Sequence, residues 1–572
     1  MSNVVLGKGP AKDLGNSSSA VAEAVMAETH QVENQAGPLP DYNAYLDDRA
    51  LVDAVKREGG EWGHEQLVRM GELCGSVDYN KLGYLANANG PELRTHDAFG
   101  ARVDEVEFHP AYHELFSVAK KEGLHSLPWT NPKPGAHVVR TAMGYMQSIV
   151  DAGHGCPLTM THAGIATLRM QPDLAEKWEP LITNNIYDAR NIPAHEKKGL
   201  TMGMAMTEKQ GGSDVRLNTT KAIPVAAGGP GQEYELVGHK YFVSGPMGDV
   251  FLMLANAPGG LSCFLVPRWR ADSTKNQFQL QQLKKKMGNV SNATAESELR
   301  GALGWLIGEE GKGIKTILEA VGYTRFDCIL GSVANMRSVV QQILHFTSKR
   351  IAFGKPLIEQ PLMENVLADL VIESEASMAM MMRLARSLDM ASVDESEKHF
   401  KRMGTAVGKY WVCKRTPAHA YEAMECIGGS ATMETSIMPR LYREAPINAI
   451  WEGCGNVQAL DVLRAMAKDP ASLDVFLQET LKAKGADSHF DKYLVGLQKE
   501  FTNFENMEYR ARVIVQKMAV AMQASILIQS DNQVVAEAFC ASRLGEEGHL
   551  MYGTLPTGLN TKAIVEQARF VS

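Results

Sequence analysis

The seven residues Ile450-Trp451-Glu452-Gly453-Cys454-Gly455-Asn456 are the first candidate for chemistry in this chain. They lie between one helical pattern that ends near Glu444 and a second that runs from Val457 to Lys468. Glycines beside a carboxylate let the backbone approach a ligand closely, which suits a general base that removes a proton from a bound small molecule. The alternative is a structural role, because a glutamate just before a helix also interacts favourably with the partial positive charge of the helix N-terminus.

The rest of the chain must position this loop, and its 572 residues are enough for three or four domains of ordinary size. Hydrophobic residues make up 45% and charged residues 22%, which is typical of soluble globular proteins. The net charge of -8 gives no reason to expect a general nucleic-acid binder.

The cysteines and the N-terminal residues bear on location and on metals. Eight cysteines are scattered without C-x-x-C pairs, which favours free thiols in a reducing compartment over disulfides or a zinc site. His109 and His113 lack the glutamate of an H-E-x-x-H motif, so we expect structural histidines and no metal. The first forty residues show no signal-peptide pattern, and no apolar run reaches the ~18 residues of a membrane span. We expect a cytoplasmic protein with no membrane span, and a mitochondrial or peroxisomal location stays open.

The spacing of apolar residues divides the chain into five parts and predicts an α+β fold. Residues 1–40 form a flexible leader, and residues 41–198 form an N-terminal helical domain. Short segments rich in β-forming residues predict a small antiparallel β domain at 199–305. A helical bundle follows at 306–470, and residues 471–572 form an additional helical domain. No G-x-G-x-x-G fingerprint follows a strand, so a nucleotide cofactor must be held in some other way.

The order of helical, β and helical domains resembles that of the acyl-CoA dehydrogenase family. Met206-Thr207-Glu208-Lys209-Gln210-Gly211-Gly212-Ser213-Asp214-Val215 is similar to the family's flavin-contacting segment, V-T-E-x-x-x-G-S-D. The resemblance implies that FAD is the cofactor and that Met206, Thr207, Gly212 and Ser213 contact it. A threonine hydroxyl beside the N–H groups of a Gly-Gly-Ser turn offers donors for such contacts.

Residues 238–244, Gly-His-Lys-Tyr-Phe-Val-Ser, resemble a second family motif, G-x-K-x-[WF]-[IV]-[TS]. This resemblance implies that Phe242 packs along the flavin ring and that Ser244 reaches its N5 region. Taken alone, the segment is a β-strand with an aromatic residue on its buried face.

Three further motifs imply cofactor contacts later in the chain. Residues 350–357 resemble R-x-x-F-G-x-x-[LI], in which the Arg and Phe, here Arg350 and Phe353, hold the FAD of a neighbouring subunit. A guanidinium group is well suited to a pyrophosphate. Residues 425–429 resemble Q-x-x-G-G with Glu in place of Gln, which leaves the backbone of Gly428 and Gly429 to approach the dinucleotide. The 450–456 loop resembles I-[YW]-E-G-x-x-[QN], which implies Glu452 as the base and cofactor contacts from Ile450, Trp451, Gly453 and Asn456.

The AidB-type, alkylation-response branch of the family is the most similar, since residues 29–35, 261–264 and 439–444 also match it. The implied reaction is the α,β-dehydrogenation of an acyl-CoA thioester. Glu452 takes the α-proton, flavin N5 accepts the β-hydrogen as hydride, and the backbone N–H of the base and an FAD hydroxyl hold the thioester oxygen. Ser213 and Arg325 are the candidates for acyl-CoA contacts, with an ordinary ion pair as the alternative for Arg325. The resemblance also implies a homotetramer, a dimer of dimers with FAD near a subunit interface.

Two other functions fit the same scaffold. One is a non-catalytic protein that binds and sequesters an acyl-CoA or fatty-acyl ligand. The other, suggested by the AidB-type branch, is association with DNA during an alkylation response. Residues 471–572 contain ten Lys and Arg against twelve Asp and Glu, so the charge of this region does not favour a DNA-binding face.

Overall fold

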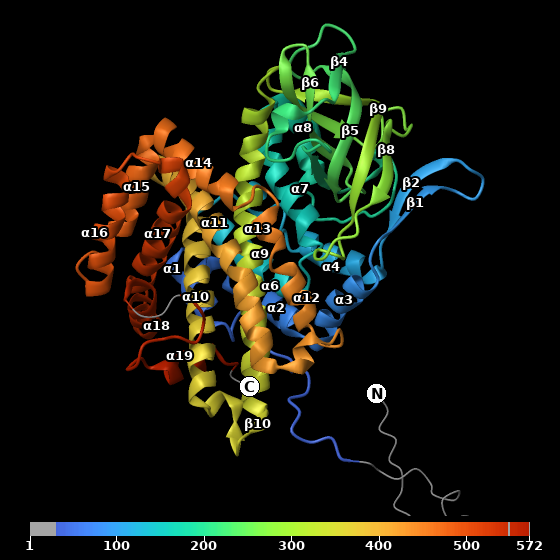
Figure 1. The fold of residues 1–572 in the computed structure, drawn as a ribbon. Helices are drawn as coiled ribbons and strands as arrows, with labels where there is room; N and C mark the ends of the chain where they lie inside the picture. Colours follow the sequence, from blue (N-terminus) through green and yellow to red (C-terminus); the bar gives the residue numbers. More distant parts are fainter. Residues whose placement is uncertain (1–29, 547–549, 571–572) are drawn as a thin grey trace, which may run out of the picture.

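The computed structural model describes residues 30–546 and 550–570. The greater part of the expected leader, residues 1–29, therefore lies outside the described residues. Figure 1 shows the long helices α9, α10 and α11 at the centre, with the β domain toward one side and the additional C-terminal helices on the other. The fold is α+β, with the domain types in the predicted order.

The N-terminal domain packs around helix α6 (Ala136–Val150), which is buried on nearly every side and contacts α2 and the long helices α9 and α10. Most polar positions of α6 are buried as well, and Arg140 pairs with Asp327 of α9 at 2.6 Å, which compensates a charge inside the core. The other helices of the domain are α1 (Arg49–Arg57), α2 (His64–Gly75), α3 (Val77–Ala88), α4 (Pro110–Lys121), α5 (Leu127–Thr130), α7 (Gly155–Leu168) and α8 (Pro172–Ile182).

This domain also contains a hairpin that the helical pattern does not predict, formed by β1 (Glu92–His96) and β2 (Arg102–Glu107). The Asp97 carboxylate accepts hydrogen bonds from the N–H groups of Phe99 and Ala101, both at 2.9 Å, and Gly100 has a φ of +85°. The turn therefore defines the hairpin. β1 is largely exposed, β2 is partly buried, and charged residues interrupt both strands, so no clear apolar pattern marks them in the sequence.

The β domain consists of β3 (Met202–Ala205), β4 (Lys221–Pro224), β5 (Glu233–Ser244), β6 (Val250–Ala257), β7 (Gly260–Pro267), β8 (Phe278–Leu283) and β9 (Thr294–Ile307). Strands β6, β4, β5, β9 and β7 pair in a closed ring, so the sheet is barrel-like, while β3 and β8 add to β6 and β9. The pairings are antiparallel as predicted, except that β3 and β4 each run parallel to β6.

A bulge in β5 determines the direction of one predicted cofactor contact. The pairing of β5 with β9 shifts register between Lys240 and Val243, which leaves Tyr241 and Phe242 without partners on β9. Bulges bend a strand and re-aim its side chains. Phe242 is 49% exposed, so it does not lie on the buried face of the strand.

The C-terminal bundle is built on α9 (Gly313–Lys349), α10 (Pro361–Met390) and α11 (Glu395–Ile427), which pack against one another. Between α9 and α10 lies the small hairpin of β10 (Ile351–Ala352) and β11 (Lys355–Pro356). Helices α12 (Met438–Glu444), α13 (Ile447–Ile450) and α14 (Gly455–Lys468) complete the bundle.

The additional region contains α15 (Pro470–Leu481), α16 (Ser488–Thr502), α17 (Met507–Ile528), α18 (Gln533–Phe539) and α19 (Thr561–Ala568). It docks on the bundle through α17 and through Arg543, which forms buried ion pairs with Asp369 at 2.5 Å and Glu373 at 3.3 Å. By length and composition α17 could cross a membrane, but 72% of its most apolar window is buried within the protein. That burial is typical of a core helix.

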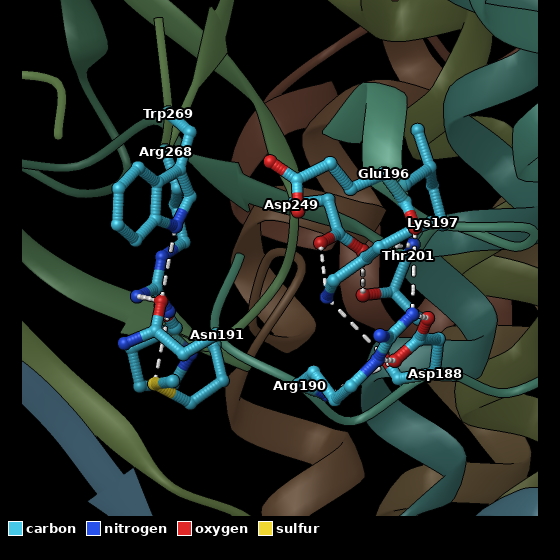
Figure 2. Close-up of polar contacts among 12 residues, drawn as sticks. Asp188, Arg190, Asn191, Glu196, Lys197, Thr201, Asp249, Arg268 and Trp269 are labelled. Carbon is cyan, nitrogen blue, oxygen red and sulfur yellow. Dashed lines mark hydrogen bonds and ion pairs between the residues drawn. The ribbon is translucent and has the colours of Figure 1, made fainter. Parts of the chain in front are cut away.

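The connection between α8 and β3 is fastened to the β domain by a polar network (Figure 2). Lys197 Nζ lies 2.7 Å from Asp249 Oδ1, and Asp249 Oδ2 accepts a hydrogen bond from the Thr201 N–H at 2.8 Å. Arg268, just after β7, donates to Asn191 Oδ1 at 2.8 Å. Because Asn191 and Lys197 lie on the connection while Asp249 and Arg268 lie on the β domain, the network holds the connection against that domain.

Candidate active site

A cavity of about 1640 Å³ lies where the β domain meets α9, α14 and the 450–456 loop. This volume exceeds the ~300–1,000 Å³ typical of a site for one small ligand, so the cavity has room for a cofactor together with a substrate. Eleven of the predicted site residues line it: Met206, Thr207, Gly212, Ser213, Phe242, Ser244, Arg325, Ile450, Trp451, Glu452 and Gly453.

Glu452 lies in the turn between α13 and α14, and its carboxylate is half-buried on the cavity wall. Its Oε2 accepts a hydrogen bond from the Thr324 hydroxyl on α9 at 2.8 Å. Its φ is +56°, a left-handed conformation that costs ~1–2 kcal/mol for a residue other than glycine. The surrounding structure must therefore hold the base in place, which is typical of a functional position.

Lys409 on α11 is the main anchor of this turn, and sequence reasoning missed it. Its ammonium group donates to the carbonyl oxygens of Asn448 at 3.0 Å, Trp451 at 2.9 Å and Gly453 at 2.9 Å. Gln458 Nε2 adds a bond to the Gly453 carbonyl at 2.9 Å. The one available signal is a lysine among apolar residues of α11, where its neighbours Val407 and Tyr410 are also buried.

Arg325 lines the cavity but is largely engaged by the protein itself. Its Nη1 lies 2.9 Å from Asp461 Oδ2, and its Nε donates to the Glu452 carbonyl oxygen at 3.2 Å. Asp461 also pairs with Arg402 at 2.8 Å. The ion-pair alternative therefore describes this geometry, and a substrate contact from Arg325 stays a prediction.

The 206–215 segment follows β3 and is joined to β5 by a buried ion pair. Glu208 Oε1 lies 2.9 Å from Lys240 Nζ, and both side chains are fully buried. The Glu208 carboxylate also accepts hydrogen bonds from the N–H groups of Thr219 at 2.7 Å and Thr220 at 3.2 Å. This pair connects the two segments that the motifs assign to the flavin.

The residues of these segments fit a bound flavin. Within the described part of the chain, the buried Thr207 Oγ1 has no hydrogen-bond partner, although its residue lines the cavity. Gly212 and Ser213 lie exposed at the turn that follows, and the half-exposed ring of Phe242 borders the same space, with Lys284 Nζ 4.5 Å from its centroid. A hydroxyl without a partner and a half-exposed aromatic ring suit the polar edge and the flat face of an isoalloxazine.

Five predicted cofactor contacts do not line the cavity of a single chain: Arg350, Phe353, Gly428, Gly429 and Asn456. Arg350 ends α9 and donates to the Asn34 carbonyl oxygen at 2.5 Å, and Phe353 in the next hairpin is 97% exposed. Gly428 and Gly429 are exposed at the end of α11, and Asn456 is exposed on α14. The motif at 350–357 assigns Arg350 and Phe353 to the FAD of a neighbouring subunit, and that assignment stays a prediction.

The two histidines considered for a metal have structural partners. His109 caps α4 by accepting from the Ala111 N–H at 3.1 Å, and His113 Nδ1 lies 2.9 Å from the Tyr187 hydroxyl. Across residues 30–546 and 550–570, no group of three or more His, Cys, Asp or Glu side chains is arranged to hold a metal ion.

Comparison with known proteins places this architecture in a family. Three protein-family profiles match: the adaptive response protein AidB N-terminal domain at residues 34–189, the acyl-CoA dehydrogenase middle domain at 203–302 and the acyl-CoA dehydrogenase C-terminal domain at 311–467. The putative acyl-CoA dehydrogenase AidB of Escherichia coli (strain K12) is 41% identical over 91% of this chain and 95% of its own length. Acyl-CoA dehydrogenase family member 11 of Caenorhabditis elegans is 30% identical over 80% of this chain and 77% of its own.

Solved structures agree with these matches. ACDH-11 of Caenorhabditis elegans, in complex with C11-CoA, superposes with a TM-score of 0.82 at 27% identity, covering 91% of this chain and 94% of that one. The apo form of Bd2924 superposes with a TM-score of 0.79 at 28% identity, covering 86% and 98%. The chain therefore belongs to the acyl-CoA dehydrogenase family of FAD-dependent oxidoreductases, and to the AidB-type branch within it.

Proposed function

We propose that the protein dehydrogenates an acyl-CoA thioester between Cα and Cβ, with Glu452 as the base that takes the α-proton. The observation that carries this proposal is the position of the Glu452 carboxylate, which lines the same cavity as Thr207 and Phe242 and is held by Thr324 at 2.8 Å. A general base must lie within hydrogen-bond reach of the proton that it removes, and a carboxylate on the wall of a ligand-sized cavity satisfies that condition.

In this proposal Met206, Thr207, Gly212, Ser213, Phe242 and Ser244 hold the flavin. When bound, FAD supplies the acceptor for the β-hydrogen. The backbone N–H of Glu452 donates to no group among the described residues, so it is free to hold the thioester oxygen. Such a donor stabilises the charge that develops as the α-proton leaves, typically by ~3–4 kcal/mol.

The ligand class and the assembly are parts of the same proposal. The C11-CoA bound to ACDH-11, at a TM-score of 0.82, supports an acyl-CoA as the ligand. Arg350 and Phe353 lie off the cavity in one chain, which supports an assembly in which each subunit completes its neighbour's FAD site, and the assembly in this proposal is a homotetramer. A cytoplasmic location also belongs to the proposal.

Anaerobic titration of the FAD-loaded protein with C11-CoA tests the reaction. We expect loss of flavin absorbance with the wild type and none with Glu452→Gln, although this variant should retain FAD. Tight binding of C11-CoA without any loss of absorbance in the wild type would instead indicate a sequestering protein. Salt-dependent retention on duplex DNA is the test for the DNA-associated alternative.

A further inference from the structure

The charge of Lys409 is unusual because it is buried without a carboxylate. The residue is 2% exposed, and its three N–H bonds all go to backbone carbonyl oxygens, those of Asn448, Trp451 and Gly453. Among the described residues, no carboxylate lies within ion-pair distance of its Nζ. The dipoles of these carbonyl groups therefore compensate a full positive charge directly behind the 450–456 loop.

One of these carbonyls shares a peptide unit with the N–H group of Glu452. The Trp451 carbonyl oxygen, which accepts from Lys409 at 2.9 Å, and the Glu452 N–H are the two ends of the Trp451–Glu452 peptide. A cation on the oxygen withdraws electron density from the amide and makes its N–H a stronger donor. The Glu452 N–H has no partner within the described residues, and its residue lines the cavity.

We propose that Lys409 is a positioning residue that acts through the Trp451–Glu452 peptide and strengthens the Glu452 N–H as the donor to the acyl thioester oxygen. The inference rests on the proposed function and names a residue that acts on the same site. The hydrogen bonds from Lys409 to the Trp451 and Gly453 carbonyls also hold the turn on both sides of Glu452, whose backbone has the left-handed φ of +56°. As the α-proton passes to the Glu452 carboxylate, negative charge moves onto the thioester oxygen, and the polarised N–H stabilises it.

The test compares Lys409→Gln, which keeps donors but removes the charge, with Lys120→Gln as a matched control. Lys120 is also fully buried and donates to one backbone carbonyl, that of Leu200 at 2.8 Å, but it lies on α4 away from the loop. The probe is a C11-CoA analogue in which sulfur replaces the β-methylene, so that its α-proton can leave but no hydride can. FAD-loaded proteins of matched FAD content are used throughout.

Two readouts separate charge from simple packing. The first is the infrared stretch of the ¹³C-labelled thioester carbonyl, which hydrogen bonding moves to lower wavenumber. The second is the rate at which deuterium from D₂O enters the α-carbon. We expect Lys409→Gln to shrink the infrared shift and to slow exchange about three- to tenfold at nearly unchanged affinity for the analogue. Lys120→Gln should match the wild type in both.

Folded, FAD-loaded Lys409→Gln with the wild-type infrared shift and exchange rate would overturn the inference. If this variant does not fold, Lys409→Met replaces it, because a thioether of similar length has no charge and cannot donate to the three carbonyls. A reduced shift in that variant supports the inference, and an unchanged one refutes it. If the wild type itself shows neither shift nor exchange, the proposed function fails first, and the role of Lys409 falls with it.

Discussion

Replacing Glu208 by glutamine should destabilise the β domain and loosen the predicted flavin segment. Glu208 and Lys240 form a fully buried ion pair at 2.9 Å, and Lys240 Nζ also donates to the Leu254 carbonyl oxygen at 2.6 Å. Glutamine can keep a hydrogen bond to the ammonium group but not its countercharge. Lys240 would then carry a buried charge with no carboxylate beside it.

The size of the expected loss of stability follows from the environment of the ion pair. Burial by itself disfavours the Glu208 carboxylate, but Lys240 and the hydrogen bonds from Thr219 and Thr220 outweigh burial and lower the pKa of Glu208 to about 2. The ionised Glu208 carboxylate therefore contributes its full stabilisation above the ordinary carboxyl pKa of about 4.5, and this contribution is lost as the pH falls toward 2, whereas burial lowers the pKa of Lys240 and so opposes its charge. At ~1.4 kcal/mol per pH unit the loss amounts to ~3 kcal/mol. Removing one partner of a buried ion pair typically costs ~3–5 kcal/mol, and the ~3 kcal/mol expected for Glu208 lies at the lower end of that range.

Urea unfolding at pH 7, with and without bound FAD, measures the effect. We expect Glu208→Gln to lose ~3 kcal/mol and to bind FAD more weakly, because the 206–215 segment loses its anchor to β5. The double variant Glu208→Leu/Lys240→Met, which removes both charges, should lose less than the sum of the two single variants. A loss below ~1 kcal/mol for Glu208→Gln, or strict additivity in the double variant, would refute the reasoning.

Three further predictions concern the bundle and the loop. Burial raises the pKa of Asp389 to about 7, so its favourable contribution to stability is full below pH ~4 and is lost as the pH rises through 7. Asp389→Asn should flatten the dependence of the free energy of unfolding on pH across that window by up to ~4 kcal/mol, and an unchanged profile would argue against it. Arg543→Met removes a partner from the buried carboxylates of Asp369 and Glu373 and should lower the free energy of unfolding by ~3–5 kcal/mol. Amide hydrogen exchange in α17 to α19 should become faster, and wild-type exchange rates there would contradict the docking role of Arg543. Gly453→Ala should lower the free energy of unfolding by ~1–3 kcal/mol and slow catalysis, because Gly453 has a φ of +96° and a Cβ would come within 2.8 Å of Val457 and Gln458. A variant as stable and active as the wild type would show that the turn tolerates a side chain.

Local motifs and apolar spacing predict the domain order and much of the cavity wall. The 206–215 segment and the 450–456 loop carry their geometry in short runs of residues, so their cavity-lining members are visible in the sequence. Phe242 is less accessible to such reasoning. Its exposure depends on a bulge against β9, and the register of two strands separated by fifty residues is not a local property.

The contacts that hold the base come from distant helices and could not be predicted. Thr324 lies 128 residues before Glu452, and its hydroxyl donates to the Glu452 carboxylate. Lys409 lies 42 residues before Trp451, and its ammonium group holds the backbone of the turn that carries Glu452. A hydroxyl and an ammonium group on buried helix faces have no motif of their own. The role predicted for Arg350 and Phe353 depends on a second subunit. In a single chain the two residues lie away from the cavity, and their contact with FAD stays a prediction.

Solvent exchange at the α-carbon is the most direct measure of whether Glu452 is the base. The FAD-loaded protein is incubated in D₂O with the C11-CoA analogue that cannot release a hydride, and deuterium at the α-carbon is followed by mass spectrometry. Wild-type protein should catalyse exchange, and Glu452→Gln, with FAD and analogue still bound, should slow it at least ~100-fold. Equal exchange rates in the two proteins would contradict the assignment of the base to Glu452.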